Sequence, residues 1–113
     1  MMTLAGDEIG INDALALVNG GKSIFVWMGG PTPTPLYQLL GIESSKVLSV
    51  EPYELVDKET YPKALERFER PIFVCHHGIS SCDVVEHIRS FGKSGYSLGG
   101  GLEGLKRRSK TRN

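Results

Sequence analysis

Short apolar runs alternate with stretches of helical character along this chain, and this alternation constrains the fold more than any other feature. Each run is nearly continuous and rich in Ile, Val, Phe or Trp, which is typical of a short strand buried on both faces. The runs are SIFVWM at 23–28, KVLSV at 46–50, PIFV at 71–74 and the shorter Tyr96–Leu98. Strands that alternate with helices predict an α/β fold, with a mainly parallel central sheet and helices on both faces.

The segments around these runs carry the spacing or the end signals of helices. Asn12 or Asp13 can cap the first helix, and Ser80 or Ser81 can cap the long one that Gly92 ends. Three prolines in the segment 29–35 remove backbone donors and restrict φ, so we expect a stiff loop there. The expected helices cover residues 11–19, 36–40, 53–57, 61–69, 80–91 and 102–108.

The 113 residues have the usual length of one domain, but their charges are unevenly distributed. Five of the 13 Lys and Arg residues lie in 106–113, so residues 1–105 carry eight positive charges against 13 negative ones. We therefore expect a single domain over 1–105 and a flexible basic tail over 106–113. The chain as a whole has no net charge, which argues against nucleic acid as a partner.

We expect neither an export signal nor a membrane-spanning segment from this sequence. No apolar run approaches the roughly 20 residues that span a bilayer, so we expect no membrane partner. The first ten residues, MMTLAGDEIG, have neither a basic segment nor a long apolar one, and they do not predict a signal peptide. Two cysteines without an export signal favour reduced thiols in the cytoplasm over a disulfide framework.

The segment after the apolar run at 71–74 combines a cysteine, a short loop and the start of a helix. Ligands of parallel α/β folds bind where the strands end, which is where this loop lies. N–H groups and the dipole at a helix N-terminus favour an anion, so the thiol of Cys75 should have a lowered pKa and react as a thiolate. Gly78 lets the loop turn without a clash from a Cβ atom. The loop and helix start comprise Cys75, His76, His77, Gly78, Ile79, Ser80 and Ser81.

The stretch Pro71–Leu105 resembles the C-terminal half of a rhodanese domain. Members of that family end a strand in the catalytic cysteine and continue through a six-residue loop into a helix. A glycine and a short strand then lead into Leu-x-Gly-Gly. Here the loop is Cys75–Ser80, the glycine is Gly92 and the last motif is Leu98–Gly101. The resemblance implies a rhodanese-like single domain, with a close match over about a third of the chain.

The resemblance also implies a thiosulfate sulfurtransferase-like enzyme with Cys75 as its catalytic nucleophile. The cysteine would take a sulfane sulfur from a small donor such as thiosulfate and hold it as a persulfide. It would then pass the sulfur to a thiol, to cyanide or to a protein acceptor. Residues 76–81 would form the active-site loop, whose N–H groups stabilise the persulfide anion. Neither a metal nor an organic cofactor is expected.

Several positions differ from the pattern of that family. Val26–Gly29 stands where members often have Asp-x-Arg, and the usual Gly-His-Ile-Pro-Gly-Ala stretch is missing. The sixth loop residue is Ser80 instead of Arg or Thr, and its hydroxyl can bond a sulfur anion or cap the helix but brings no positive charge. Leu105 replaces a frequent aromatic residue. These differences concern the substrate more than the fold.

Three side chains near Cys75 have more than one interpretation. His76 and His77 can tune the thiolate, bind an anionic donor or remain exposed loop residues, and they do not by themselves predict a metal site. Cys82, seven residues after Cys75, is expected to be core-facing or half-buried on the helix. The alternative is a resolving thiol that forms a disulfide with oxidised Cys75.

Two other functions compete with sulfur transfer. A cysteine phosphatase or arsenate reductase also uses a thiolate cradle, but it needs the spacing Cys-x5-Arg, and position 81 is Ser instead of the phosphate-clamping Arg. A catalytically degenerate rhodanese module for protein binding or for sulfur or redox sensing would keep the fold without the reaction. The divergent N-terminal half favours the module, and the intact Cys75 favours the enzyme.

Overall fold

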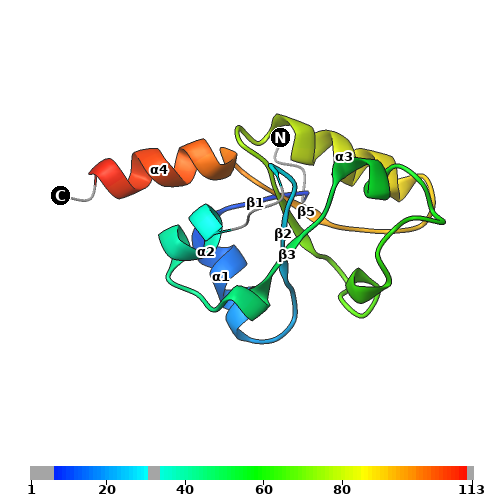
Figure 1. Ribbon diagram of the computed structural model, residues 1–113, viewed down its shortest axis with the longest axis horizontal. Coiled ribbons are helices and arrows are strands. Elements are labelled where there is room, and N and C mark those ends of the chain that lie inside the picture. Colours follow the sequence, from blue (N-terminus) through cyan, green and yellow to red (C-terminus); the bar gives the residue numbers. More distant parts are fainter. Residues whose placement is uncertain (1–6, 31–33, 112–113) are drawn as a thin grey trace.

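Strands and helices alternate along the chain as predicted, in a computed structural model that describes residues 7–30 and 34–111 (Figure 1). The strands are β1 (Glu8–Ile9), β2 (Phe25–Trp27), β3 (Val47–Ser49), β4 (Ile72–Val74) and β5 (Tyr96–Leu98). The α-helices are α1 (Ile11–Asn19), α2 (Thr34–Leu40), α3 (Ile79–Arg89) and α4 (Gly101–Thr111). Three short 3-10 turns are η1 (Ser44–Lys46), η2 (Pro52–Leu55) and η3 (Lys63–Leu65).

The five strands form one sheet in the order β1-β5-β4-β2-β3, and each neighbouring pair is parallel. Strand β4 therefore lies at the centre, between β5 and β2. Its register places Val74 opposite Trp27, so these two strands end at the same level. The predicted α/β fold with a parallel central sheet is confirmed.

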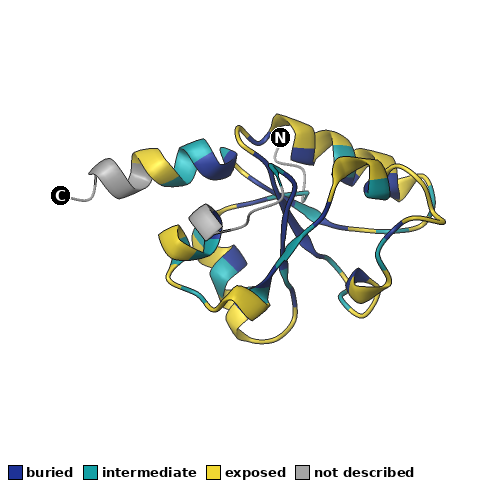
Figure 2. Ribbon diagram, in the orientation of Figure 1, coloured by how far each residue is buried: buried dark blue, intermediate teal, exposed yellow. Residues whose placement is uncertain are grey.

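Alternate residues of the central strands pack into two separate cores, one on each face of the sheet. Trp27 and Val74 pack with buried residues of α1, α2 and α4. Val26 and Phe73 point to the other face and pack with α3, η2 and η3. Figure 2 shows the strands as the dark, buried centre between exposed outer helices. Because both faces are covered, each strand residue can be apolar, which explains the continuous apolar runs.

The predicted helix caps are wrong at both helices. Helix α1 already begins at Ile11 with Gly10 as its extended N-cap, because β1 ends at Ile9 and leaves Gly10 alone to connect the two elements. Asn12 and Asp13 therefore lie inside the first turn. Helix α3 begins at Ile79 after Gly78, which adopts the left-handed conformation at φ 88°. Ser80 and Ser81 are thus helical residues instead of caps.

The helices expected at 53–57 and 61–69 are only the short 3-10 turns η2 and η3. A proline stands at or just before the start of each turn, and one buried leucine, Leu55 or Leu65, anchors each to the core. These anchors hold the turns by packing, so a longer helix is not needed to cover this face. The predicted element type is wrong, and the apolar residues do not form one buried side, because Leu65 is buried whereas Ala64 is exposed.

Several boundaries also differ from the predictions. Helix α2 begins at Thr34, so Pro35 belongs to its first turn, where a proline is tolerated, and not to the expected loop. Residues 31–33 of that loop lie outside the described residues. The sequence did not predict β1, which has two residues and is too short for a periodic pattern. Strand β1 pairs with β5 through Glu8 opposite Ser97.

Helix α4 is longer than the predicted 102–108, because it runs from Gly101 to Thr111. The backbone of the expected basic tail is therefore helical up to Thr111, and residues 112–113 lie outside the described part. The division into a domain over 1–105 and a flexible tail stays a prediction. Over residues 7–30 and 34–111, no helix combines the length and the apolar character required to cross a bilayer.

Candidate functional site

The candidate site lies at the carboxyl end of the central strand β4. Cys75 directly follows Val74, and helix α3 begins four residues later. Gly78 permits this tight turn, because its φ of 88° is unfavourable for any residue with a Cβ atom. A Cβ atom there would also lie 3.0 Å from the backbone nitrogen of Gly100. The strand-loop-helix arrangement that the sequence predicted is thus present.

Hydrogen-bond donors from the loop and from α3 converge on the Cys75 sulfur. The N–H groups of Gly78 and Ser81 donate to Sγ over 3.1 and 3.3 Å, and Ser81 Oγ lies 3.4 Å from Sγ. Cys75 itself is 6% exposed. The sulfur is therefore shielded from bulk water and surrounded by donors that suit a negative charge.

Burial alone raises the pKa of the Cys75 thiol, since it penalises the thiolate. The hydroxyl of Ser81 acts in the opposite direction, and so do the N–H groups of Ser81, Gly78 and His77. Together these hydrogen bonds outweigh burial, so the pKa of Cys75 is lowered from its ordinary value. Hydrogen bonds, and not a cationic side chain, thus lower the pKa of Cys75 and favour its thiolate.

The Leu98–Gly101 motif supports the loop from behind. At the start of α4, the N–H groups of Leu102 and Glu103 donate to the carbonyls of Cys75 and His76, each over 2.8 Å. A Cβ atom at Gly101 would lie 2.4 Å from the Cys75 carbonyl oxygen, so only glycine allows this close approach. The glycines therefore let α4 dock directly on the backbone that carries the candidate nucleophile.

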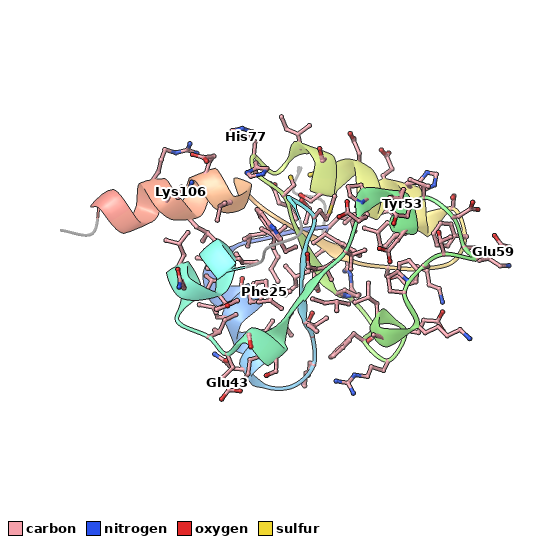
Figure 3. All side chains as sticks on the ribbon, viewed as in Figure 1. Phe25, Glu43, Tyr53, Glu59, His77 and Lys106 are labelled. Atoms are coloured by element: carbon pink, nitrogen blue, oxygen red, sulfur yellow. The ribbon has the colours of Figure 1, made fainter. Side chains whose placement is uncertain are left out.

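A cavity of about 410 Å³ opens over the cysteine. Its lining is Met28, Gly29, Pro52, Cys75, His76, His77, Ile79 and Ser80. Figure 3 shows His77 at the upper edge of the molecule, on the turn between β4 and α3. The cavity provides space next to the sulfur for a small reactant.

The two loop histidines have different surroundings. The His76 ring packs edge-on against Trp27 with 5.2 Å between ring centroids, and its Nε2 lies 3.2 Å from the Gly29 carbonyl oxygen. His77 is exposed, although its backbone N–H faces the sulfur. Among the described residues, no group of three or more His, Cys, Asp and Glu side chains could hold a metal ion.

The structure brings the predicted loop residues together, but Ser80 does not contact the sulfur. Gly78 and Ser81 contact the sulfur, whereas His76, His77, Ile79 and Ser80 line the cavity. The hydroxyl beside the sulfur belongs to Ser81, not to the sixth loop residue Ser80 as expected. The reason is that α3 begins at Ile79, which turns Ser81 inward, where it is fully buried, and leaves Ser80 exposed.

Cys82 is exposed, which corrects the expectation of a core-facing or half-buried residue. Ser81 and Val85 occupy the inward side of α3, so Cys82 lies beside that side on the first turn. Its thiol still donates to Ser97 Oγ over 3.3 Å, and both cysteines are free thiols. Sequence reasoning missed Ser97, because one hydroxyl within the short run Tyr96–Leu98 gives no signal of its own.

The geometry described above occurs in a fold shared with solved structures. A rhodanese-related protein from Thermoplasma volcanium is 20% identical, with a TM-score of 0.63 over 89% of this chain and 91% of that one. The human single-domain sulfurtransferase TSTD1 is 16% identical, with a TM-score of 0.58 over 90% of this chain and 97% of that one. An NAD-dependent persulfide reductase from A. fulgidus is 20% identical, with a TM-score of 0.55 over 87% of this chain but only 16% of that one.

No family model matches the sequence, and no curated protein sequence matches it significantly. The structural likeness therefore defines the class through the fold. The chain is an α/β domain with the rhodanese-like fold, as the resemblance of Pro71–Leu105 implied.

Proposed function

We propose that this protein is a sulfurtransferase or persulfide carrier that moves a sulfane sulfur through Cys75. The convergence of the Gly78 and Ser81 donors on one buried sulfur, beside a cavity of about 410 Å³, carries this proposal. A thiolate in this position is available to attack, and the cavity has space for one further sulfur atom and its donor. The rhodanese-like fold supports the same interpretation.

With thiosulfate as donor, the reaction has two balanced steps. The Cys75 thiolate attacks the outer sulfur of thiosulfate, an S–S bond forms to the cysteine, and the S–S bond of thiosulfate breaks to release sulfite. Cyanide or a thiolate then attacks the outer sulfur of the persulfide. The new bond yields thiocyanate or an acceptor persulfide, and the electron pair of the broken S–S bond returns to Cys75 as thiolate.

The loop N–H groups have a defined task in both steps. They stabilise the thiolate before transfer, and the outer sulfur of the persulfide extends from Sγ toward the cavity, where the negative charge then lies. His77 lines the cavity, and its backbone N–H group faces the sulfur. This chemistry needs neither a metal nor an organic cofactor, and we propose that it operates on reduced thiols in the cytoplasm.

A protein acceptor is favoured by the rim of the cavity. Ile79 lines the opening and is 70% exposed, an unusual degree of exposure for a large apolar side chain that packs in no core cluster. A partner that delivers its own thiol to Cys75 would cover Ile79. The same surface would serve a degenerate binding module, so the chemistry of Cys75 has to be tested directly.

The deciding experiment is intact-mass analysis of the reduced protein after incubation with thiosulfate or with a low-molecular-weight persulfide. We expect a gain of one sulfur atom that Cys75→Ser abolishes and that cyanide or a thiol removes. Cys82→Ser runs beside it and tells whether the sulfur resides on the second cysteine. If no donor adds sulfur while Cys75 is open to alkylation, the sulfurtransferase proposal is wrong and the binding module takes its place.

A further inference from the structure

Two buried hydroxyl groups connect Cys75 to the second cysteine of the chain. Ser81 Oγ lies 3.4 Å from Cys75 Sγ and 2.6 Å from Ser97 Oγ. Ser97 Oγ in turn lies 3.3 Å from Cys82 Sγ. Ser81 is fully buried and Ser97 is 1% exposed, whereas Cys82 is exposed. The four groups form a continuous hydrogen-bonded chain from the candidate nucleophile to the surface.

The position of Ser97 on β5 explains how the hydrogen bonds connect this strand with helix α3. Ser97 lies on β5 opposite Phe73 of β4, so its side chain points to the face that α3 covers. Its own N–H donates to the Asp7 carbonyl, and this bond keeps the strand in register with the start of β1. The hydroxyl of Ser97 forms its hydrogen bonds with the side chains of Ser81 and Cys82 on α3.

The number of protons limits how these groups can be oriented. Each hydroxyl has one proton to donate and each thiol has one at most. When Cys75 is a thiolate, Ser81 must donate to it, Ser97 must donate to Ser81, and the thiol of Cys82 must donate to Ser97. When Cys75 is protonated, the first donor can be the Cys75 thiol itself and the order can reverse.

We propose that Ser97 is a positioning residue that turns the Ser81 hydroxyl toward the Cys75 thiolate, with the Cys82 thiol as the terminal donor. Its use in sulfur transfer rests on the proposed function, but the effect on Cys75 does not. Removing the Ser97 hydroxyl leaves Ser81 without its donor inside a buried site. The oxygen of Ser81 then regains a partner only by taking the proton of the Cys75 thiol, which disfavours the thiolate.

The pH dependence of Cys75 alkylation by iodoacetamide, followed by peptide mass analysis, tests this orientation. We expect Ser97→Ala to raise the apparent pKa of Cys75 by about one unit, which is about a tenfold slower reaction below the midpoint. Ser97→Thr restores a hydroxyl and should return the midpoint toward that of the wild type. Recovery in Ser97→Thr separates the loss of the hydroxyl from a change in packing, because the added methyl group of threonine would not undo a packing change.

A second pair of variants tests Cys82, the exposed end of the hydrogen-bonded series. Cys82→Ala removes the terminal donor and should raise the midpoint in the same direction but by less, about a two- to threefold slower reaction. Cys82→Ser keeps a donor and should lie closer to the wild type than Cys82→Ala. Ser90→Ala is the matched control, because the Ser90 hydroxyl donates to the His87 carbonyl at the C-terminal end of α3, far from Cys75.

The Ser97 variants leave every other titratable group on the elements around Cys75 in place, and the Cys82 variants remove only the Cys82 thiol. A shift seen with Ser97→Ala therefore cannot come from a change in their number. These groups include His76 and His77 in the loop, Asp83, Glu86, His87 and Arg89 in α3, Tyr96 in β5, Glu103, Lys106 and Arg107 in α4, Glu8 in β1, and Glu51 and Glu54 around η2.

An unchanged midpoint in folded Ser97→Ala would overturn the proposal. A shift with Ser97→Ala but none with Cys82→Ala would overturn the part given to Cys82. If thermal unfolding shows that Ser97→Ala does not fold, the comparison of Cys82→Ala with Cys82→Ser decides instead. Sulfur uptake is measured separately. If the wild type takes up no sulfur but the variants show these shifts of the midpoint, the proposed function is wrong and the positioning role of Ser97 is supported.

Discussion

At Cys75, burial and hydrogen bonding act on the charge of one sulfur atom in opposite directions. Burial disfavours the thiolate, while the Ser81 hydroxyl and three loop N–H groups favour it and prevail. A lone buried cysteine would be an inert small hydrophobe, so the donors decide the chemistry here. Three of these donors are backbone N–H groups that the loop conformation aims at Sγ, and the fourth is the side-chain hydroxyl of Ser81.

The lowered pKa of Cys75 predicts how stability depends on pH. Between the folded pKa and the ordinary thiol value of 9.0, the unfolded chain holds a proton that the folded protein has released. Stability from this group therefore rises with pH through that window and is lost as pH falls through the folded pKa. We expect the free energy of unfolding of the wild type, relative to Cys75→Ala, to increase with pH there in urea titrations. A constant difference would contradict the lowered pKa.

Gly101 provides a second test at the scale of a single residue. Gly101→Ala would place a Cβ atom 2.4 Å from the Cys75 carbonyl oxygen, at a φ of 58°. We expect destabilisation of at least about 1–3 kcal/mol from the strained backbone, together with slower alkylation of Cys75. Gly10→Ala is the control, because nothing lies within 4 Å of its Cβ position and its φ is −84°. Equal effects of both variants would contradict the close-approach argument.

Among the elements, β4 has the largest part in positioning the site. It is paired on both sides, it contributes residues to both cores, and it ends at Val74, directly before Cys75. Helix α3 brings Ser81 to the sulfur from one side, and the start of α4 binds the loop carbonyls from the other. The candidate nucleophile is thus supported by β4 and α3, which flank its loop, and by α4, which follows one strand later.

Phe73 tests the dependence of the site on β4. It is fully buried in the core under α3, so Phe73→Ala should cost about 3–5 kcal/mol of folding free energy in denaturant titrations. Phe68→Ala removes the same side chain from a half-exposed position near η3 and should cost clearly less. Similar losses for the two variants would contradict the assignment of Phe73 to the central core.

On the scale of the whole molecule, one sheet separates two cores and α4 extends away from them. The radius of gyration of 13.1 Å is that of a compact domain of this length. Figure 1 shows α4 projecting along the longest axis, while its first turn donates hydrogen bonds to the Cys75 loop at the carboxyl end of β4. The exposed Lys106 and Arg107 lie on the projecting part. The basic residues are therefore displaced from the mainly acidic body.

Hydrogen exchange should report this arrangement. The amides of β4 and β2 lie inside the sheet and between both cores, so those of Phe73 and Val26 should be among the slowest to exchange. Strand β1 is an edge strand of two residues, and its pairing with β5 should protect its amides much less. Mass-resolved exchange of peptides from these strands provides the measurement. Uniform protection across the sheet would contradict it.

Local chemistry was sufficient to predict much of the fold and the centre of the site. The apolar runs around 25–27 and 72–74 are strands because their Ile, Val, Phe and Trp residues leave no polar face to expose, and the run around 47–49 is the partly buried strand at the edge of the sheet. The same order placed Cys75 at the end of a strand and before a helix, which is where it lies. These features depend on neighbours in the sequence, so a single sequence determines them.

The tertiary structure decided which polar groups meet. The N-cap residues of α1 and α3 are set by where β1 and the Cys75 loop end. Because α3 begins at Ile79, the hydroxyl that contacts the sulfur belongs to Ser81 and not to Ser80. The 3-10 turns at η2 and η3 are held by single buried leucines. Ser97 reaches Ser81 and Cys82 only because β5 pairs beside β4 under α3. Strand pairing between distant segments creates these contacts, and no local pattern encodes them.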